Sequence, residues 1–124
     1  MLSRTAHNAL IDIRFNIALI EDFVWGFDFE TFERELKTVY ATTRALEIIS
    51  EASRRLPDEL KARHPGLLWK QMQSAGNRYR HNDDGVEASL IWRTAHDSLP
   101  PLMAVVEAEL AAADLEGRQE STDP

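Results

Sequence analysis

The chain has 124 residues, no cysteine and a formal net charge of −7 at pH 7. A single domain of this length can bury a core without disulfides or a structural metal, and the lack of cysteine excludes disulfides, thiolate metal sites and a cysteine nucleophile. The negative charge argues against a protein that coats nucleic acid by bulk electrostatics. Because no stretch approaches the ~20 apolar residues of a membrane span and no secretory pattern opens the chain, we expect a cytoplasmic protein without a membrane segment.

The first element is predicted from apolar residues that recur at spacings of four and three. This spacing is typical of one face of a long helix, and its members are Ala6, Leu10, Ile13, Ile17, Ile20 and Val24. Gly26 tolerates the left-handed conformation found at helix ends, so we expect the helix to end there. Asp28 then predicts the N-cap of a short turn through Phe29 and Phe32.

A second long helix follows in the middle of the chain. Its apolar side is predicted to consist of Leu36, Val39, Leu46, Ile49 and Leu56. Pro57 followed by two acids predicts a new helix start, which the Pro65–Gly66 pair closes. Helix is expected again over residues 68–81, and the polar run 82–85 predicts a loop.

The last helix is predicted to begin at Val86, and Pro100–Pro101 must end or kink it because proline lacks a backbone N–H. The apolar pattern resumes at Leu102. The predicted fold class is therefore all-α, an antiparallel up-and-down bundle of four to five helices. We expect residues 1–115 to form this domain and residues 116–124 to form an acidic, disordered tail.

Positive charge is concentrated in one window of this acidic chain. Residues 61–81 contain five Lys/Arg, two histidines and no acidic residue. Such a basic island favours a local site that faces phosphate. The alternatives are a solvated, charged helix and a basic window that pairs with acids elsewhere in the chain.

Outside this window, the sequence contains no phosphate-binding glycine loop, zinc signature or nucleophile elbow. No two of the four histidines have the i, i+4 spacing of a helical metal pair, so we expect no metal and no cofactor. Trp92 and His96 do have this spacing, but packing is the favoured interpretation. Arg44 with Glu47, and Glu51 with Arg55, indicate an ordinary ion-paired helix face.

The segment 75–82 places a histidine, two arginines, an asparagine and an aromatic residue at a helix end. His81 can move a proton near neutral pH, and Arg78 and Arg80 can hold a phosphate through a negatively charged transition state. Tyr79 can stack a base, and Lys70 is a second candidate RNA-binding residue. This chemistry suits metal-independent RNA cleavage, in which the ribose 2′-hydroxyl attacks the adjacent phosphate. The simpler interpretation is a basic helix C-terminus that meets the helix dipole.

The order of several short segments resembles the HepT-like family, HEPN-domain toxins encoded beside a minimal nucleotidyltransferase antitoxin. The likeness runs from about Leu10 to Leu110. The segments that carry it are Phe29–Phe32, Leu46–Ala52, Leu60–Pro65, Trp69, Ile91–Thr94 and Asp97–Leu102. The last two segments follow a histidine at this distance, and together they are more specific for the family than any single segment.

The family's catalytic motif is an arginine, usually followed by asparagine, with four residues between the arginine and a histidine, and a tyrosine two residues further on. His81 and Asn77 match the histidine and the asparagine. Gly76 stands at the arginine position and Asp83 at the tyrosine position, so the motif is degenerate. Arg78 or Arg80 would have to supply the missing cation, although each step along a helix rotates a side chain by ~100°.

The resemblance implies an endoribonuclease that acts on RNA as a homodimer, with the histidine as acid/base and the arginine as phosphate clamp. It also implies that the antitoxin adenylylates the tyrosine, which this chain lacks. The departures at Gly76 and Asp83 support an alternative, a catalytically inactive HEPN binding module or a substrate-recognition subunit for a nucleotidyltransferase partner. A helical dimer without a nucleic-acid role is the third possibility. The sequence therefore leaves enzymatic activity open.

Overall fold

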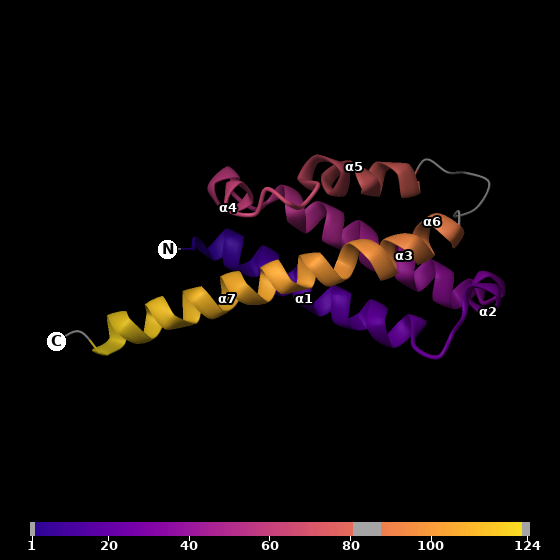
Figure 1. The fold of residues 1–124 in the computed structure, drawn as a ribbon, viewed down its shortest axis with the longest axis horizontal. Coiled ribbons are helices and arrows are strands. Elements are labelled where there is room, and N and C mark those ends of the chain that lie inside the picture. The colour runs from indigo at the N-terminus through magenta and orange to yellow at the C-terminus, as the bar shows by residue number, and fades with distance from the viewer. Residues whose placement is uncertain (1, 81–87, 123–124) are drawn as a thin grey trace.

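The computed structural model describes the backbone of residues 2–80 and 88–122, with side chains over residues 2–75 and 88–118. The regular structure of these residues is helical throughout: α1 (Arg4–Val24), α2 (Phe29–Arg34), α3 (Leu36–Arg54), α4 (Asp58–Ala62), α5 (Trp69–Arg80), α6 (Ala88–Arg93), the π-helical turn η1 (Thr94–Ser98) and α7 (Leu99–Thr122). Figure 1 shows the four long helices α1, α3, α5 and α7 running alternately in opposite directions, with the short helices at the two ends. The predicted all-α, up-and-down antiparallel bundle is confirmed.

The turn between α1 and α2 follows from three residues. Gly26 has a positive φ of 83°, a conformation that glycine adopts at little cost. The Asp28 carboxylate accepts a hydrogen bond from the Thr31 N–H at 2.8 Å, and the Thr31 hydroxyl accepts one from the Asp28 N–H at 3.1 Å. The hydrogen bond from the Thr31 N–H lowers the pKa of Asp28. The predicted helix end and N-cap are therefore both confirmed, as a reciprocal capping box.

The core lies where α1, α3 and α7 meet. The predicted α1 seam is buried from Ala6 to Ile20. It packs mainly against α3 and α7, whose buried side chains include Leu46, Ile49, Leu102 and Val106. Leu36 was expected on the apolar side of α3, but it is 63% exposed. The reason is its place at the first position of that helix.

The α-helical hydrogen-bond pattern is interrupted just before the two prolines, as expected, but the chain stays helical. The chain passes from α6 through η1 into α7, and Pro100 and Pro101 lie in the first turn of α7. Proline cannot donate the hydrogen bond that an α-helix requires of it. A π-helical turn joins residues five apart by hydrogen bonds. It therefore changes the hydrogen-bond spacing just before the point where Pro100 and Pro101 lack a backbone N–H.

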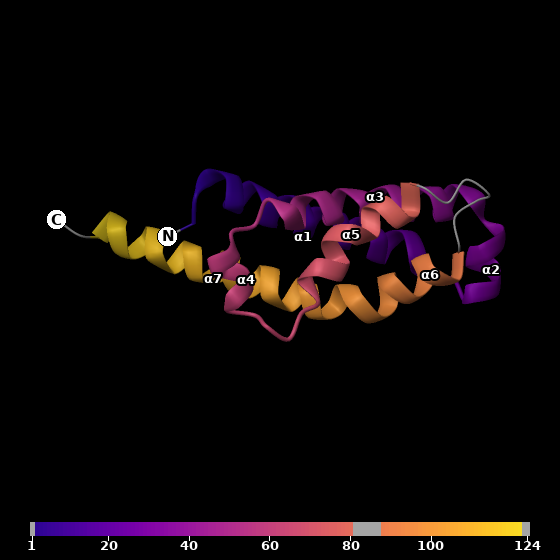
Figure 2. The ribbon, with the colours of Figure 1, turned by 90° about the horizontal axis from the view of Figure 1, so that it is seen from above.

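The segment predicted as an acidic tail continues α7 as far as Thr122. Figures 1 and 2 show this end of α7 extending beyond the other helices, and residues 114–118 are exposed. The domain boundary at residue 115 and the disorder of the tail stay predictions. The predicted loop 82–85 lies outside the described residues. Within the described part of the chain, no helix is long and apolar enough to cross a membrane.

Candidate functional site

The candidate residues lie on or directly after α5. Lys70 is exposed in its first turn, and the backbone of residues 77–80 forms its last turn. His81 and Asp83 lie outside the described residues, as do the side chains of Asn77, Arg78, Tyr79 and Arg80. The structure thus places the helix that carries the first two of the four motif positions, and the site assignments themselves stay predictions.

Helix geometry separates the candidate positions into two groups. Residues three, four or seven apart share one face of a helix. Positions 70, 73, 77 and 80 therefore lie along one face of α5, and position 76 borders that face. Positions 78 and 79 fall more than 100° away from position 73. Of the two arginines predicted to replace the motif arginine, only Arg80 shares a face with Asn77.

This face of α5 is joined to α3 through one carbonyl group. The Gln73 carbonyl oxygen accepts hydrogen bonds from the Ser50 hydroxyl at 3.0 Å and from the Arg54 Nε–H at 3.0 Å. Ser50 is buried, whereas Arg54 is exposed at the end of α3. Because Gln73 lies one turn before Gly76 and Asn77, these two donors fix the backbone directly ahead of the motif.

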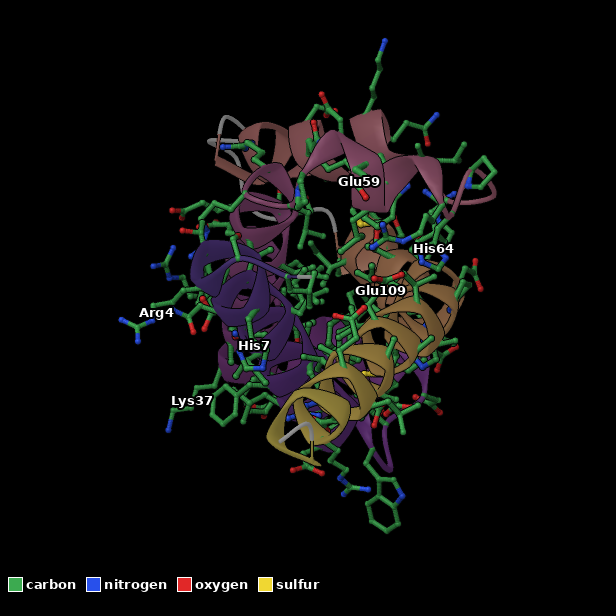
Figure 3. All side chains as sticks on the ribbon, turned by 90° about the vertical axis from the view of Figure 1, so that its left-hand side faces the viewer. Arg4, His7, Lys37, Glu59, His64 and Glu109 are labelled. Atoms are coloured by element: carbon green, nitrogen blue, oxygen red, sulfur yellow. The ribbon has the colours of Figure 1, made fainter. Side chains whose placement is uncertain are left out.

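The start of α5 is held by a second set of polar contacts. The Trp69 indole N–H donates to the His64 carbonyl at 3.0 Å. His64 Nε2 lies 2.7 Å from Glu109 Oε2, and Arg63 donates to both oxygens of the same carboxylate, at 2.6 and 3.3 Å. Figure 3 shows His64 and Glu109 facing each other across the gap between the α4–α5 connection and α7. The basic window is therefore tied to α7 at its N-terminal end.

Charge and partial burial act together on Glu109. Its side chain is 12% exposed. The hydrogen bond from Arg63, and after it the one from His64, lowers the pKa of Glu109, against the opposing effect of burial. The same hydrogen bond raises the pKa of Arg63. Two members of the basic window, Arg63 and His64, thus pair with an acid elsewhere in the chain. This is the arrangement expected if the window has no role in binding nucleic acid.

An apolar groove of about 390 Å³ lies along the side of α5 that carries Met72 and Ala75, away from position 73. Its lining comes from α3, α5, α6, η1 and α7, and includes Leu46, Met72, Leu90 and Leu102. Asp97 is the one ionisable side chain among the described residues that line it. Since a phosphate requires cations or N–H donors, this groove does not suit an RNA backbone.

Trp92 and His96 have a packing role. Their ring centroids are 4.0 Å apart, and Trp92 also packs against Phe32 at 5.1 Å and Phe29 at 6.2 Å. His96 Nδ1 donates to the Trp92 carbonyl at 2.7 Å, which assigns the proton to that nitrogen. These contacts join α2 to α6, so the packing interpretation is confirmed. The Arg44–Glu47 ion pair, at 3.2 Å, is confirmed as well, whereas Arg55 pairs with Asp12 of α1 at 3.0 Å and not with Glu51.

No group of three or more histidine, aspartate or glutamate side chains that could hold a metal ion occurs among the described residues. The absence of a metal site from the whole chain stays a prediction.

Sequence reasoning missed the neighbours of α5 on α3. Arg54 and Ser50 contact Gln73 across 19 and 23 residues of chain, and nothing in a local pattern indicates such a pairing. One signal was present: Ser50 and Arg54 are four residues apart and so share a face of α3.

Comparison with known proteins identifies the family. The family model described as ribonuclease HepT-like matches residues 13–109. The probable ribonuclease HepT of Thermococcus cleftensis is 36% identical over 106 residues, which are 86% of this chain and 96% of that protein. A protein of Methanocaldococcus jannaschii named "Putative RNase" is 31% identical over 113 residues, 91% of this chain and 92% of its own length.

A further "Putative RNase", from Caldanaerobacter subterraneus, is 34% identical over 79 residues, 64% of this chain and 70% of that protein. No solved structure matches this chain. The family model covers more than three quarters of the sequence, and the matched segment includes α5 and most of the helical bundle described above. The chain therefore belongs to the HepT-like ribonuclease family.

Proposed function

We propose that this chain is a metal-independent endoribonuclease that cuts RNA as a homodimer in the cytoplasm. It would be the toxin of a toxin–antitoxin pair whose antitoxin is a minimal nucleotidyltransferase. The observation that carries the proposal is the match of His81 and Asn77 to the motif in a chain of the HepT-like family. The names of its relatives, which describe ribonucleases, support it.

The proposed reaction needs only groups that this chain can supply. His81 takes the proton from a ribose 2′-hydroxyl, whose oxygen attacks the adjacent phosphorus. The bond from phosphorus to the 5′-oxygen breaks, and that oxygen takes up a proton, leaving a 2′,3′-cyclic phosphate and a 5′-hydroxyl. Cations stabilise the negative charge that develops on the phosphoryl oxygens. Arg80 is the better placed of the two neighbouring arginines, since position 80 shares a helix face with position 77.

The second candidate function is a catalytically inactive binding module, or a substrate-recognition subunit for a nucleotidyltransferase. It is favoured by the glycine and aspartate at positions 76 and 83, which remove the motif arginine and the tyrosine that a partner would adenylylate. The two candidates differ in one observable property. The binding module binds the nucleotidyltransferase and leaves RNA intact.

The experiment is cleavage of a mixed RNA pool by the purified protein in the presence of a chelator. The wild-type protein is expected to cut, and His81→Ala is expected to abolish cleavage while leaving the melting temperature nearly unchanged. His7→Ala serves as the matched control, because His7 is an exposed histidine of α1. Sedimentation of the same samples measures the oligomeric state.

Three outcomes would contradict the proposal. If the chelator stops cleavage, the enzyme requires a metal. If His81→Ala unfolds the protein, the histidine is structural. If a folded, dimeric wild-type protein cuts no RNA but purifies with a nucleotidyltransferase, the binding module is the correct function.

A further inference from the structure

The Gly76 position leaves the candidate site without its expected guanidinium, and α3 places one beside it. Arg54 is the last residue of α3. Its Nε lies 3.0 Å from the carbonyl oxygen of Gln73, which is three residues before Gly76 and on the neighbouring part of the same helix face. Three residues of α-helix span ~4.5 Å, so the guanidinium held at Gln73 lies within about one helical turn of the Gly76 backbone.

The direction of α3 brings this side chain toward the motif. Figures 1 and 2 show α3 and α5 side by side and antiparallel. Helical side chains lean toward the N-terminus of their own helix. For Arg54 this direction leads toward the C-terminal end of α5, where Gly76 and Asn77 lie.

The hydrogen-bonding state of Arg54 leaves its charge available. The Arg54 side chain is exposed, and its hydrogen bond to Gln73 uses the Nε–H alone. Among the described residues, no carboxylate makes an ion pair with Arg54, whereas Arg44, Arg55 and Arg63 each pair with an acid. The two Nη groups are the pair of donors that bind a phosphate in bidentate fashion.

We infer that Arg54 is a phosphate-binding residue of this chain and replaces, from α3, the arginine that Gly76 removes from α5. The Gln73 carbonyl holds the guanidinium by its Nε–H and turns the Nη groups toward the phosphate beside the last turn of α5. The inference rests on the proposed ribonuclease function and adds to it the source of the missing cation.

The first test compares Arg54→Ala with Arg55→Ala. The control residue is the next arginine in the chain, is exposed, and pairs with Asp12 at 3.0 Å on the side of α1. Arg54→Ala is expected to lower kcat/KM for RNA cleavage about 100-fold, the usual effect of removing one donor to a developing oxyanion. Arg55→Ala is expected to retain the activity of the wild-type protein. Equal activity of the two variants would overturn the inference.

The second test is rescue by transfer of the charge. Gly76→Arg returns a guanidinium to α5, and a protein with both Arg54→Ala and Gly76→Arg is expected to recover at least tenfold of the lost activity. If Arg54 has a purely structural role, Gly76→Arg is expected to raise activity by the same factor with and without Arg54→Ala, whereas a shared role makes the gain larger in the Arg54→Ala background. Failure of the rescue in a double variant that melts like the wild-type protein would count against the inference.

Binding separates failure of the inference from failure of the proposed function. RNA affinity is measured at several salt concentrations in the His81→Ala background, with and without Arg54→Ala. Loss of one phosphate contact to single-stranded RNA is expected to reduce the slope of log K against log salt by about 0.7. A wild-type protein that does not cut overturns the proposed function. An unchanged slope overturns the role of Arg54, whether or not the protein cuts.

Discussion

Arg63 and Arg54 lie nine residues apart, yet their surroundings give them different roles. Arg63 makes two hydrogen bonds to Glu109, while Arg54 keeps two Nη groups without an acidic partner among the described residues. Counting charges along a window cannot separate these cases, because the deciding acid, Glu109, lies 46 residues from Arg63. The structure therefore pairs the N-terminal end of the basic window with an acid, and the phosphate-binding residue that we propose lies outside the window, on α3.

The Glu109 cluster has a testable dependence on pH. Since the folded protein lowers the pKa of Glu109, its carboxylate stabilises the fold at pH values above its ordinary pKa of 4.5. This contribution is lost as the pH falls through the lowered pKa. We expect Glu109→Gln to reduce the free energy of unfolding by about 1–3 kcal/mol at pH 7, because Arg63 and His64 lose a charged acceptor.

Urea denaturation at pH 7 and at pH 3 measures this effect. The difference between Glu109→Gln and wild type is expected to shrink at the lower pH, where the wild-type carboxylate begins to take up its proton. Glu107→Gln, an exposed acid two residues away, is the control and is expected to behave like wild type. A difference that is as large at pH 3 as at pH 7 would show that the carboxylate charge is not responsible.

At the scale of helices, the patterns that depend on neighbouring residues were predicted correctly. The α1 seam, the left-handed Gly26 and the Asp28 cap all follow from residues within a few positions of each other. The π-helical turn was not predicted, because proline is expected to break an α-helix and the compensating change lies in hydrogen-bond spacing. The contact of Arg54 with Gln73 was missed because it depends on how two helices pack.

Gly26 gives a direct test of the turn between α1 and α2. A Cβ at this position would meet no atom within 4 Å, so the cost of Gly26→Ala comes from its φ of +83° alone. We expect a loss of about 1 kcal/mol in the free energy of unfolding. Gly66→Ala is the matched control, since its surroundings are equally open and its φ is not in the left-handed region.

Thermal or urea unfolding of the two glycine variants provides the measurement. Gly66→Ala is expected to change stability by less than about 0.5 kcal/mol. Equal losses in the two variants would indicate that chain flexibility, and not the backbone conformation of Gly26, determines the effect.

Across the whole molecule, one apolar core joins buried residues of α1, α2, α3, α4, α6 and α7, while α5 and η1 contribute partly buried side chains. Ile13 is fully buried in that core, while Phe15, two residues along α1, is 62% exposed. We expect Ile13→Ala to lower the free energy of unfolding by about 2–5 kcal/mol. Phe15→Ala is expected to change it by less than about 0.5 kcal/mol in the monomer.

Urea unfolding of both variants at low protein concentration checks this contrast. A large loss for Phe15→Ala that grows with protein concentration would place this exposed phenylalanine in a contact between two copies of the chain. A small loss for Ile13→Ala would mean that the packing of α1 against α3 and α7 contributes less to stability than its burial implies.

The sequence allowed the fold class to be predicted because apolar spacing and turn residues act locally and repeat along the chain. The candidate site was predicted less completely. His81 and Asn77 could be recognised by their order in the motif. A cation supplied from another helix, as we propose for Arg54, cannot be recognised from the residues around position 76. Gly76 indicated only that an arginine was absent.

The placement of α5 has an evolutionary consequence. This helix packs mainly against α3, while the interface of α1 with α3 and α7 holds most of the core. Exposed positions of α5, such as Lys70, therefore contribute little to the buried surface on which folding depends. Their side chains are expected to tolerate substitution during evolution with little loss of stability.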